Sequence, residues 1–163
     1  MVRFGGRHFG GGHCGDASRA MGGLFRERCL MEGLVADTHA VVWYLLHSKR
    51  LSSSALSAME EMANKGYPVY VSPISMIEVI YLVEKGKLPT IAFSKLYEAM
   101  VNHDSALELA PFDLAVIRSV AEISREALPD MPDRIIAATA RMLGLPLITR
   151  DRAVSSVGVQ TIW

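Results

Sequence analysis

Short apolar runs alternate with longer amphipathic stretches along the chain from Leu34 onward. The short runs have the length and composition of buried strands, which predicts strands at residues 34–36, 69–71, 107–112, 146–149 and 159–163. Between them, apolar residues recur every three or four positions, which predicts helices at residues 40–47, 52–66, 72–86, 90–102, 114–127 and 132–144. Because strands separated by helices require crossover connections, the pattern predicts an α/β fold with a mostly parallel central sheet and helices on both faces.

The length and composition are those of one globular domain. The chain has 163 residues, of which 50% are hydrophobic and 21% are charged, a balance that supplies a substantial core and argues against a disordered chain. The 17 basic and 17 acidic residues cancel. A neutral chain lacks the broad basic surface that holds nucleic acid by charge alone, so a nucleic-acid partner would have to be bound by local features.

The first 30 residues differ from the rest of the chain. They hold eight of the 13 glycines, both cysteines, five basic residues and only two acidic ones, and they show no hydrophobic period. We therefore predict a disordered glycine-rich extension at residues 1–32 and a folded domain at residues 33–163. Because organised sequence begins near Met31, we hypothesise that Met31 is the native start, which mass spectrometry of the natively expressed protein would test.

No segment has the features of a secretory or membrane-spanning sequence. The N-terminal region lacks the apolar run of roughly seven residues that a secretory signal requires. No stretch reaches the roughly 18 uninterrupted apolar residues of a membrane span. We therefore expect a cytoplasmic location and no membrane partner.

Acidic residues occupy positions at which a parallel sheet gathers side chains. Asp37 directly follows the first predicted strand, and Asp151 follows the fourth by one residue. Glu78 lies among apolar neighbours in a predicted helix, and Asp130 and Asp133 flank the start of the last predicted helix. Each acid alone is explained by a structural role such as helix capping. Together they are expected at the carboxyl edge of the sheet, where ligands of such folds bind.

Carboxylates that lie close together repel one another and are stabilised by protons or by cations. The donors in these segments are carboxylate oxygens, which favour Mg²⁺ or Mn²⁺ over zinc. Such a cluster suits the hydrolysis of a phosphodiester, because a bound cation lowers the pKa of the attacking water and neutralises the charge that develops on the phosphate. A cation held by these acids would therefore supply the positive charge with which a chain of no net charge binds a nucleic acid.

Four motifs occur in an order and at a spacing that resemble a known family. They are Leu34-Val35-Ala36-Asp37-Thr38-His39, Ser75-Met76-Ile77-Glu78-Val79, Pro129-Asp130-Met131-Pro132-Asp133-Arg134 and Leu147-Ile148-Thr149-Arg150-Asp151. Over residues 33–163 the chain resembles the PIN-domain ribonucleases of the VapC toxin type, from type II toxin–antitoxin systems. The resemblance implies a single Rossmann-like PIN domain that cleaves RNA endonucleolytically with Mg²⁺ or Mn²⁺. It also implies a cognate antitoxin protein as a partner, and a homodimer.

The resemblance assigns roles to individual acids. Asp37, Glu78, Asp133 and Asp151 match the four acids of the family in that order, and they are the expected catalytic and metal-binding residues. Asp130 matches an acid that often stands just before the third. Two roles stay open for Asp130, an auxiliary metal ligand or a helix cap.

Neighbouring polar residues are expected to support the site. Thr149 matches a hydroxyl residue of the family that would orient an acid or a water molecule. Thr38 and Ser75 are candidates for the same task, with a local helix cap as the alternative for each. Arg134 and Arg150 adjoin the acids and are candidates for phosphate contacts, with solvated surface arginines as the alternative.

Two other functions fit part of the pattern. One is a PIN-like RNA-processing or RNA-binding protein that is not a toxin. The other is a receiver-like phosphoacceptor module, which also has an acid at the end of a strand and a downstream hydroxyl such as Thr149. The receiver-like module leaves Glu78 without a role, and the paired acids expected before the acceptor are missing from the sequence.

Overall fold

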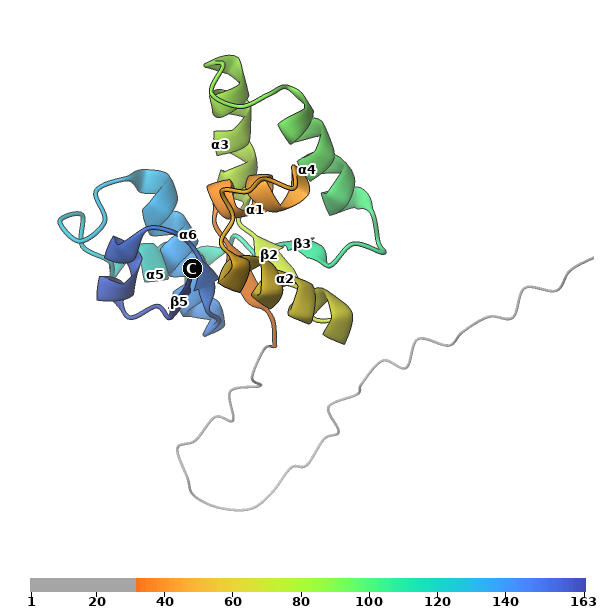
Figure 1. Cartoon of the computed structure of the whole chain (residues 1–163). Helices are drawn as coiled ribbons and strands as arrows, with labels where there is room; N and C mark the ends of the chain where they lie inside the picture. Colours follow the sequence, from red (N-terminus) through yellow and green to blue (C-terminus); the bar gives the residue numbers. More distant parts are fainter. Residues whose placement is uncertain (1–31) are drawn as a thin grey trace, which may run out of the picture.

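Five short strands form one sheet at the centre of the molecule (Figure 1). The structure is a computed structural model that describes residues 32–163. The strands are β1 (Leu34–Ala36), β2 (Val69–Val71), β3 (Leu107–Leu109), β4 (Leu147–Ile148) and β5 (Thr161–Ile162). Their order is β3-β2-β1-β4-β5, and all four neighbouring pairs are parallel. The predicted α/β fold with a parallel sheet is confirmed.

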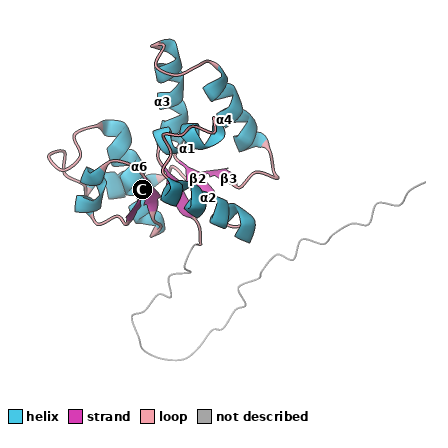
Figure 2. Ribbon diagram, viewed as in Figure 1, coloured by secondary structure: helices cyan, strands magenta, loops and turns pink. Residues whose placement is uncertain are grey.

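Helices cover both faces of this sheet (Figure 2). Within residues 32–163 the helices are α1 (Thr38–Leu45), α2 (Ser53–Lys65), α3 (Pro73–Glu84), α4 (Ile91–Val101), α5 (Leu114–Ala121), α6 (Met131–Leu143) and the short 3₁₀-helix η1 (Arg152–Val157). Alternate side chains of β1 show the division, because Leu34 and Ala36 pack in a core with α1 to α4, whereas Val35 packs in a second core with α6. The predicted arrangement of helices on both faces is confirmed.

The strand order places a switch point at β1. The chain leaves β1 toward β2 and β3 on one side, and α5 and α6 then carry it back to β4 and β5 on the other side. In open parallel sheets, ligands bind beyond the carboxyl ends of the strands at such a point. The backbone N–H of Asp37 donates to the carbonyl of Ile148 over 3.0 Å, which fixes the ends of β1 and β4 against each other.

Gly33 fixes the entry into β1. Its φ of +142° is rarely adopted by residues with a side chain, and a Cβ added there would lie 2.5 Å from the carbonyl oxygen of Pro68. The same carbonyl accepts a hydrogen bond of 3.2 Å from the N–H of Leu34. The central strand therefore begins at a position that requires glycine.

Several predicted boundaries need correction. The third, fourth and fifth strands are shorter than predicted, and η1 was not predicted. The helix predicted at residues 114–127 ends at Ala121, because the next residues form a tighter turn in which the N–H of Ile123 donates to the carbonyl of Val120. The first helix starts two residues early, at Thr38, because the Asp37 side chain caps it.

The extension predicted at residues 1–32, with the proposed start at Met31, lies outside the described residues except for Glu32. Over the described range 32–163, no helix combines the length and the apolar character needed to cross a membrane.

Candidate active site

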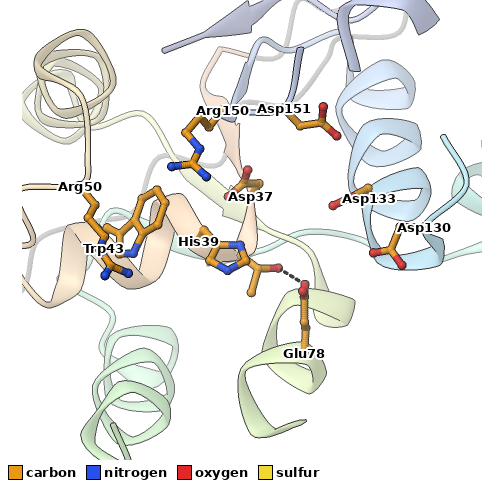
Figure 3. Close-up of a pocket in the computed structure, with 10 residues that line it drawn as sticks. Asp37, His39, Trp43, Arg50, Glu78, Asp130, Asp133, Arg150 and Asp151 are labelled. Atoms are coloured by element: carbon orange, nitrogen blue, oxygen red, sulfur yellow. Dashed lines mark hydrogen bonds between the residues drawn. The ribbon is translucent and has the colours of Figure 1, made fainter. Parts of the chain in front are cut away.

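A cavity of about 690 Å³ lies at the carboxyl edge of the sheet, where the sequence predicts the acids to meet (Figure 3). Its walls come from segments far apart in the chain, namely the end of β1 with α1, the middle of α3, the start of α6 and the residues after β4. It is lined by Asp37, Thr38, His39, Trp43, Arg50, Glu78, Asp130, Asp133, Arg150 and Asp151. All five predicted acids therefore face one cavity.

Two of the acids are held by the helices that follow them. Oδ1 of Asp37 accepts the N–H of Ala40 over 2.8 Å at the start of α1. Oδ1 of Asp151 accepts the N–H of Ala153 over 2.8 Å at the start of η1. Each cap occupies one carboxylate oxygen and fixes the rotamer, which leaves the second oxygen available to the cavity.

Glu78 is held by a residue from another element. Thr38 is buried in α1, and its Oγ1 donates to Oε2 of Glu78 over 2.6 Å (Figure 3, dashed line). This bond joins positions 40 residues apart and directs the carboxylate of α3 toward the end of β1. Of the two roles expected for Thr38, the observed bond fits the orientation of an acid, and the helix cap itself is Asp37.

Asp130 is the N-cap residue of α6, yet its side chain makes no capping hydrogen bond. Most N-cap aspartates accept a backbone N–H of the first turn. The carboxylate of Asp130 lines the cavity. Of the two roles open for this residue, the geometry favours a role in the cavity.

Asp133 lies in the first turn of α6 and shows the strongest electrostatic effect of the site. Burial, followed by the negative charges of Asp130, Asp151, Glu78 and Asp37, raises the pKa of Asp133 from its ordinary 3.8 to about 6. All four other acids contribute, so their negative charges lie close enough to act on the Asp133 carboxyl group. The five carboxylates form one electrostatic unit.

Two further predicted polar residues, Thr149 and Ser75, lie outside the cavity lining. Buried Thr149 accepts the N–H of Asp151 through Oγ1 over 3.0 Å, which supports the turn that carries this acid. Ser75 is buried in α3, and its hydroxyl has no hydrogen-bond partner among the described residues.

Arg134 corrects a prediction, because it does not point toward the acids. Its Nη2 donates to the carbonyls of Val120 and Ile123, over 3.2 Å and 2.8 Å, at the end of α5. Both carbonyls lie where α5 ends. That of Val120 also accepts the N–H of Ile123, and the guanidinium of the neighbouring helix adds a donor to each. Arg134 therefore ties α5 to α6 and is not placed for a phosphate contact.

The cavity has a cationic and aromatic side that the sequence shows only in part. Arg150 was a candidate, whereas Arg50 was missed, because it lies in the turn after α1 and no periodic pattern or motif marks it. The guanidinium carbon of Arg150 lies 5.7 Å from the centre of the Trp43 ring. His39 packs against the same ring, with the two ring centres 5.5 Å apart.

The donor set fits a divalent cation that prefers oxygen. With the side chains as they stand in residues 32–163, no three His, Cys, Asp or Glu residues form a ready-made metal site. The chemistry of the cavity nevertheless fits Mg²⁺ or Mn²⁺, because burial and then repulsion raise the pKa of Asp133, and a bound cation would relieve the repulsion. Asp37, Glu78 and Asp133 would hold it, with Asp130 and Asp151 in the same cavity.

The fold and the cavity define a class, the Rossmann-like α/β domains that carry an acidic site at the switch point of a parallel sheet. The family model described as PIN domain matches residues 34–160, which include all five acids. The chain belongs to the PIN domain family, and the resemblance drawn from its motifs is confirmed.

Comparisons with known proteins agree with this assignment. Ribonuclease VapC22 of Mycobacterium tuberculosis is 26% identical over 127 residues, which cover 77% of this chain and 92% of that protein. A chain in the crystal structure of VapBC2 from Rickettsia felis, bound to a DNA fragment from its promoter, matches with a TM-score of 0.61 and 20% identity over 80% of this chain and 97% of that chain. FitAcB from Neisseria gonorrhoeae matches with a TM-score of 0.52 and 20% identity, over 78% and 95% of the two chains. The structural matches show a shared fold.

Proposed function

We propose that this protein is an endoribonuclease that hydrolyses phosphodiester bonds of RNA with Mg²⁺ or Mn²⁺. The observation that carries the proposal is the convergence of five carboxylates on one cavity at the switch point of the sheet. Membership of the PIN domain family supports it, as does the similarity to a protein named as a ribonuclease. Asp37, Glu78, Asp133 and Asp151 are the proposed catalytic residues, with Asp130 as an additional ligand.

The chain's own residues prepare the reaction by holding oxygen atoms in place. A divalent cation, when bound, lowers the pKa of an attacking water and neutralises charge on the phosphate. The cap at Ala40 holds one oxygen of Asp37 and leaves the other for the cation, and Thr38 orients Glu78 across the cavity. Asp133 gives up its proton readily once positive charge enters the cavity, because its raised pKa comes partly from neighbouring negative charges.

Cleavage of a labelled single-stranded RNA by the purified chain tests the proposal. We expect cleavage with Mg²⁺ or Mn²⁺, none in EDTA, and a loss of at least about 100-fold in Asp37→Asn, since even outer-shell groups of metal sites contribute about 10- to 100-fold. Asp113→Asn is a matched control, because Asp113 caps α5 as Asp37 caps α1 but lies outside the cavity. Asparagine caps helices well, so both variants should fold. Full activity in Asp37→Asn would reject the assigned site.

We propose further that the protein is the toxin of a toxin–antitoxin pair and that a small antitoxin protein covers its cavity. The similarity to VapC22 and to a chain of the VapBC2 structure supports this. So does the surface beside the cavity, because α3 and α4 pack together and expose apolar side chains, which mark protein-binding surfaces. These are Ile77, Ile80, Tyr81, Ile91, Tyr97 and Val101. Because Glu78 of the same helix α3 lines the cavity, this surface adjoins the edge of the cavity.

Expression in a bacterial host separates a toxin from a housekeeping nuclease. We expect the wild-type chain to arrest growth, the Asp37→Asn variant to be harmless, and a neighbouring small gene to relieve the arrest. Normal growth together with RNA cleavage in vitro would favour an RNA-processing enzyme that is not a toxin. Sedimentation of the purified chain tests the expected homodimer.

A further inference from the structure

The cavity has two chemically different sides, and the proposed hydrolysis uses only one of them. Figure 3 shows the acids of α6 and Asp151 on one side of Asp37, and on the other side the residues His39, Trp43, Arg50 and Arg150. A volume of about 690 Å³ is in the range of small-ligand sites, roughly 300 to 1,000 Å³. The cavity therefore has room for more than a cation and one phosphate.

Trp43 forms the floor of the second side. It is only 8% exposed, and it packs against His39, Arg150 and Trp163, whose ring centre lies 5.7 Å away. A ring covered in this way offers no free face on which a base could stack. Its role is to hold the groups around it, and its contact with the guanidinium of Arg150 is a cation–π interaction that limits where that side chain can point.

Arg50 and Arg150 keep their charges free for a ligand. Both side chains line a cavity that also contains five carboxylates, yet neither guanidinium forms an ion pair or donates a hydrogen bond within residues 32–163. The two ion pairs found in that range lie elsewhere, at Lys65–Glu61 and Arg141–Glu122. Two guanidinium groups that face a cavity without partners form a site for an anion, and guanidinium binds phosphate with two parallel hydrogen bonds.

We propose that Arg50 and Arg150 form a phosphate subsite that binds the RNA phosphate adjacent to the one being cleaved. This inference rests on the proposed function, because the carboxylate side then takes the scissile phosphate with its cation. Because the arginines and the acids of α6 lie on opposite sides of Asp37 (Figure 3), we assign the arginines to the next phosphate along the strand. The subsite places the RNA backbone across the cavity and supplies local positive charge in a chain with no net charge.

Salt dependence of RNA binding tests the subsite directly. Log Kd for single-stranded RNA changes with log salt concentration by about 0.7 for each phosphate contact. We would measure binding of a short fluorescein-labelled single-stranded RNA with Mn²⁺, in an Asp37→Asn background that prevents cleavage. Arg50→Gln and Arg150→Gln should each lower the slope, and the double variant should lower it by about 0.7, the value for the one phosphate that the two arginines share. Arg152→Gln is the matched control, because Arg152 is an exposed arginine two residues from Arg150 that does not line the cavity.

The outcomes distinguish the subsite from general charge and from the proposed function. Loss of slope in Arg50→Gln and Arg150→Gln but not in Arg152→Gln supports the subsite, and in the active protein KM should rise about 10-fold with little change in kcat. Equal changes in all three variants, or no change in any, would overturn it. Mn²⁺ affinity should be unchanged in every arginine variant. If the wild-type protein cleaves RNA with Mn²⁺ while the slopes stay unchanged, the subsite fails and the proposed function stands; if the wild-type protein cleaves no RNA, the proposed function itself fails.

Discussion

Asp133→Asn is predicted to stabilise the protein when no divalent cation is present. Burial and the neighbouring carboxylates raise the pKa of Asp133 from 3.8 to about 6 in the folded chain. The folded chain therefore holds a proton at this site more tightly than the unfolded chain does. The free energy of unfolding then falls as the pH rises from about 4 through about 6, and above that window the charged carboxylate destabilises the fold. Asparagine has nearly the same shape and removes the charge.

The size of the effect follows from the two pKa values. A pKa raised by roughly two corresponds to ~3 kcal/mol, at ~1.36 kcal/mol for each pH unit. Asp133 is only half-buried, so solvent screens the charge, and about half of this energy, ~1.5 kcal/mol, is expected in practice. In a domain of this size, that energy raises Tm by about 5 °C. At pH 5, near the middle of the window, the gain is about half as large.

Thermal unfolding in EDTA at pH 8 and pH 5 measures this effect. Asp113→Asn again serves as the control, because Asp113 is an exposed cap outside the cavity and its substitution should change stability by less than about 0.5 kcal/mol. Added Mg²⁺ should stabilise the wild-type chain more than Asp133→Asn, which lacks one proposed ligand. A Tm for Asp133→Asn equal to or below that of the wild type at pH 8 in EDTA would refute the conclusion that the acids crowd around this position.

Three further substitutions test individual contacts. Thr38→Val removes the hydrogen-bond donor to Glu78 and should lower kcat about 10-fold with unchanged circular dichroism. Thr38→Ser keeps the donor and should retain activity. Equal kcat values in the two variants would contradict a positioning role for Thr38. Arg134→Leu breaks two hydrogen bonds to carbonyls and should lower the free energy of unfolding in urea by about 2 kcal/mol, without changing the salt dependence of RNA binding. Gly33→Ala should lower the free energy of unfolding by about 3 kcal/mol, because its Cβ would clash with the carbonyl of Pro68. Gly144→Ala should lower it by only about 1 kcal/mol, because there the positive φ is the only penalty. Equal losses in the two variants would contradict the clash at Gly33.

The positions predicted best from the sequence are those that local pattern determines. An apolar run followed by an acid places Asp37 and Asp151 at strand ends, and alternating strands and helices imply that those ends share one edge. The positions of Glu78 and Asp133 are harder to predict from local pattern, because packing decides whether an acid on a helix faces a cavity or solvent. The sheet topology predicts that they meet at one edge, and the resemblance of the motifs assigns them catalytic and metal-binding roles.

The errors in prediction come from contacts between distant segments. Arg134 adjoins the acids in sequence, but the carbonyls of Val120 and Ile123 at the end of α5 determine where its guanidinium lies. Arg50 reaches the cavity from a turn without any pattern that marks it. Trp43 meets Trp163 at the far end of the chain. No local propensity encodes such contacts, so of the cationic side of the cavity the sequence indicates only Arg150.

The chemical nature of the RNA ends produced by the wild-type chain tests the central claim most directly. In hydrolysis at the proposed site, water attacks the phosphorus with help from the carboxylates and a divalent cation, and the 2′-hydroxyl of the RNA takes no part. Mass spectrometry of the products should therefore find linear phosphate ends, formed only with Mg²⁺ or Mn²⁺ and lost in Asp133→Asn. Ends that carry a 2′,3′-cyclic phosphate, formed equally well in EDTA or by Asp133→Asn, would contradict it.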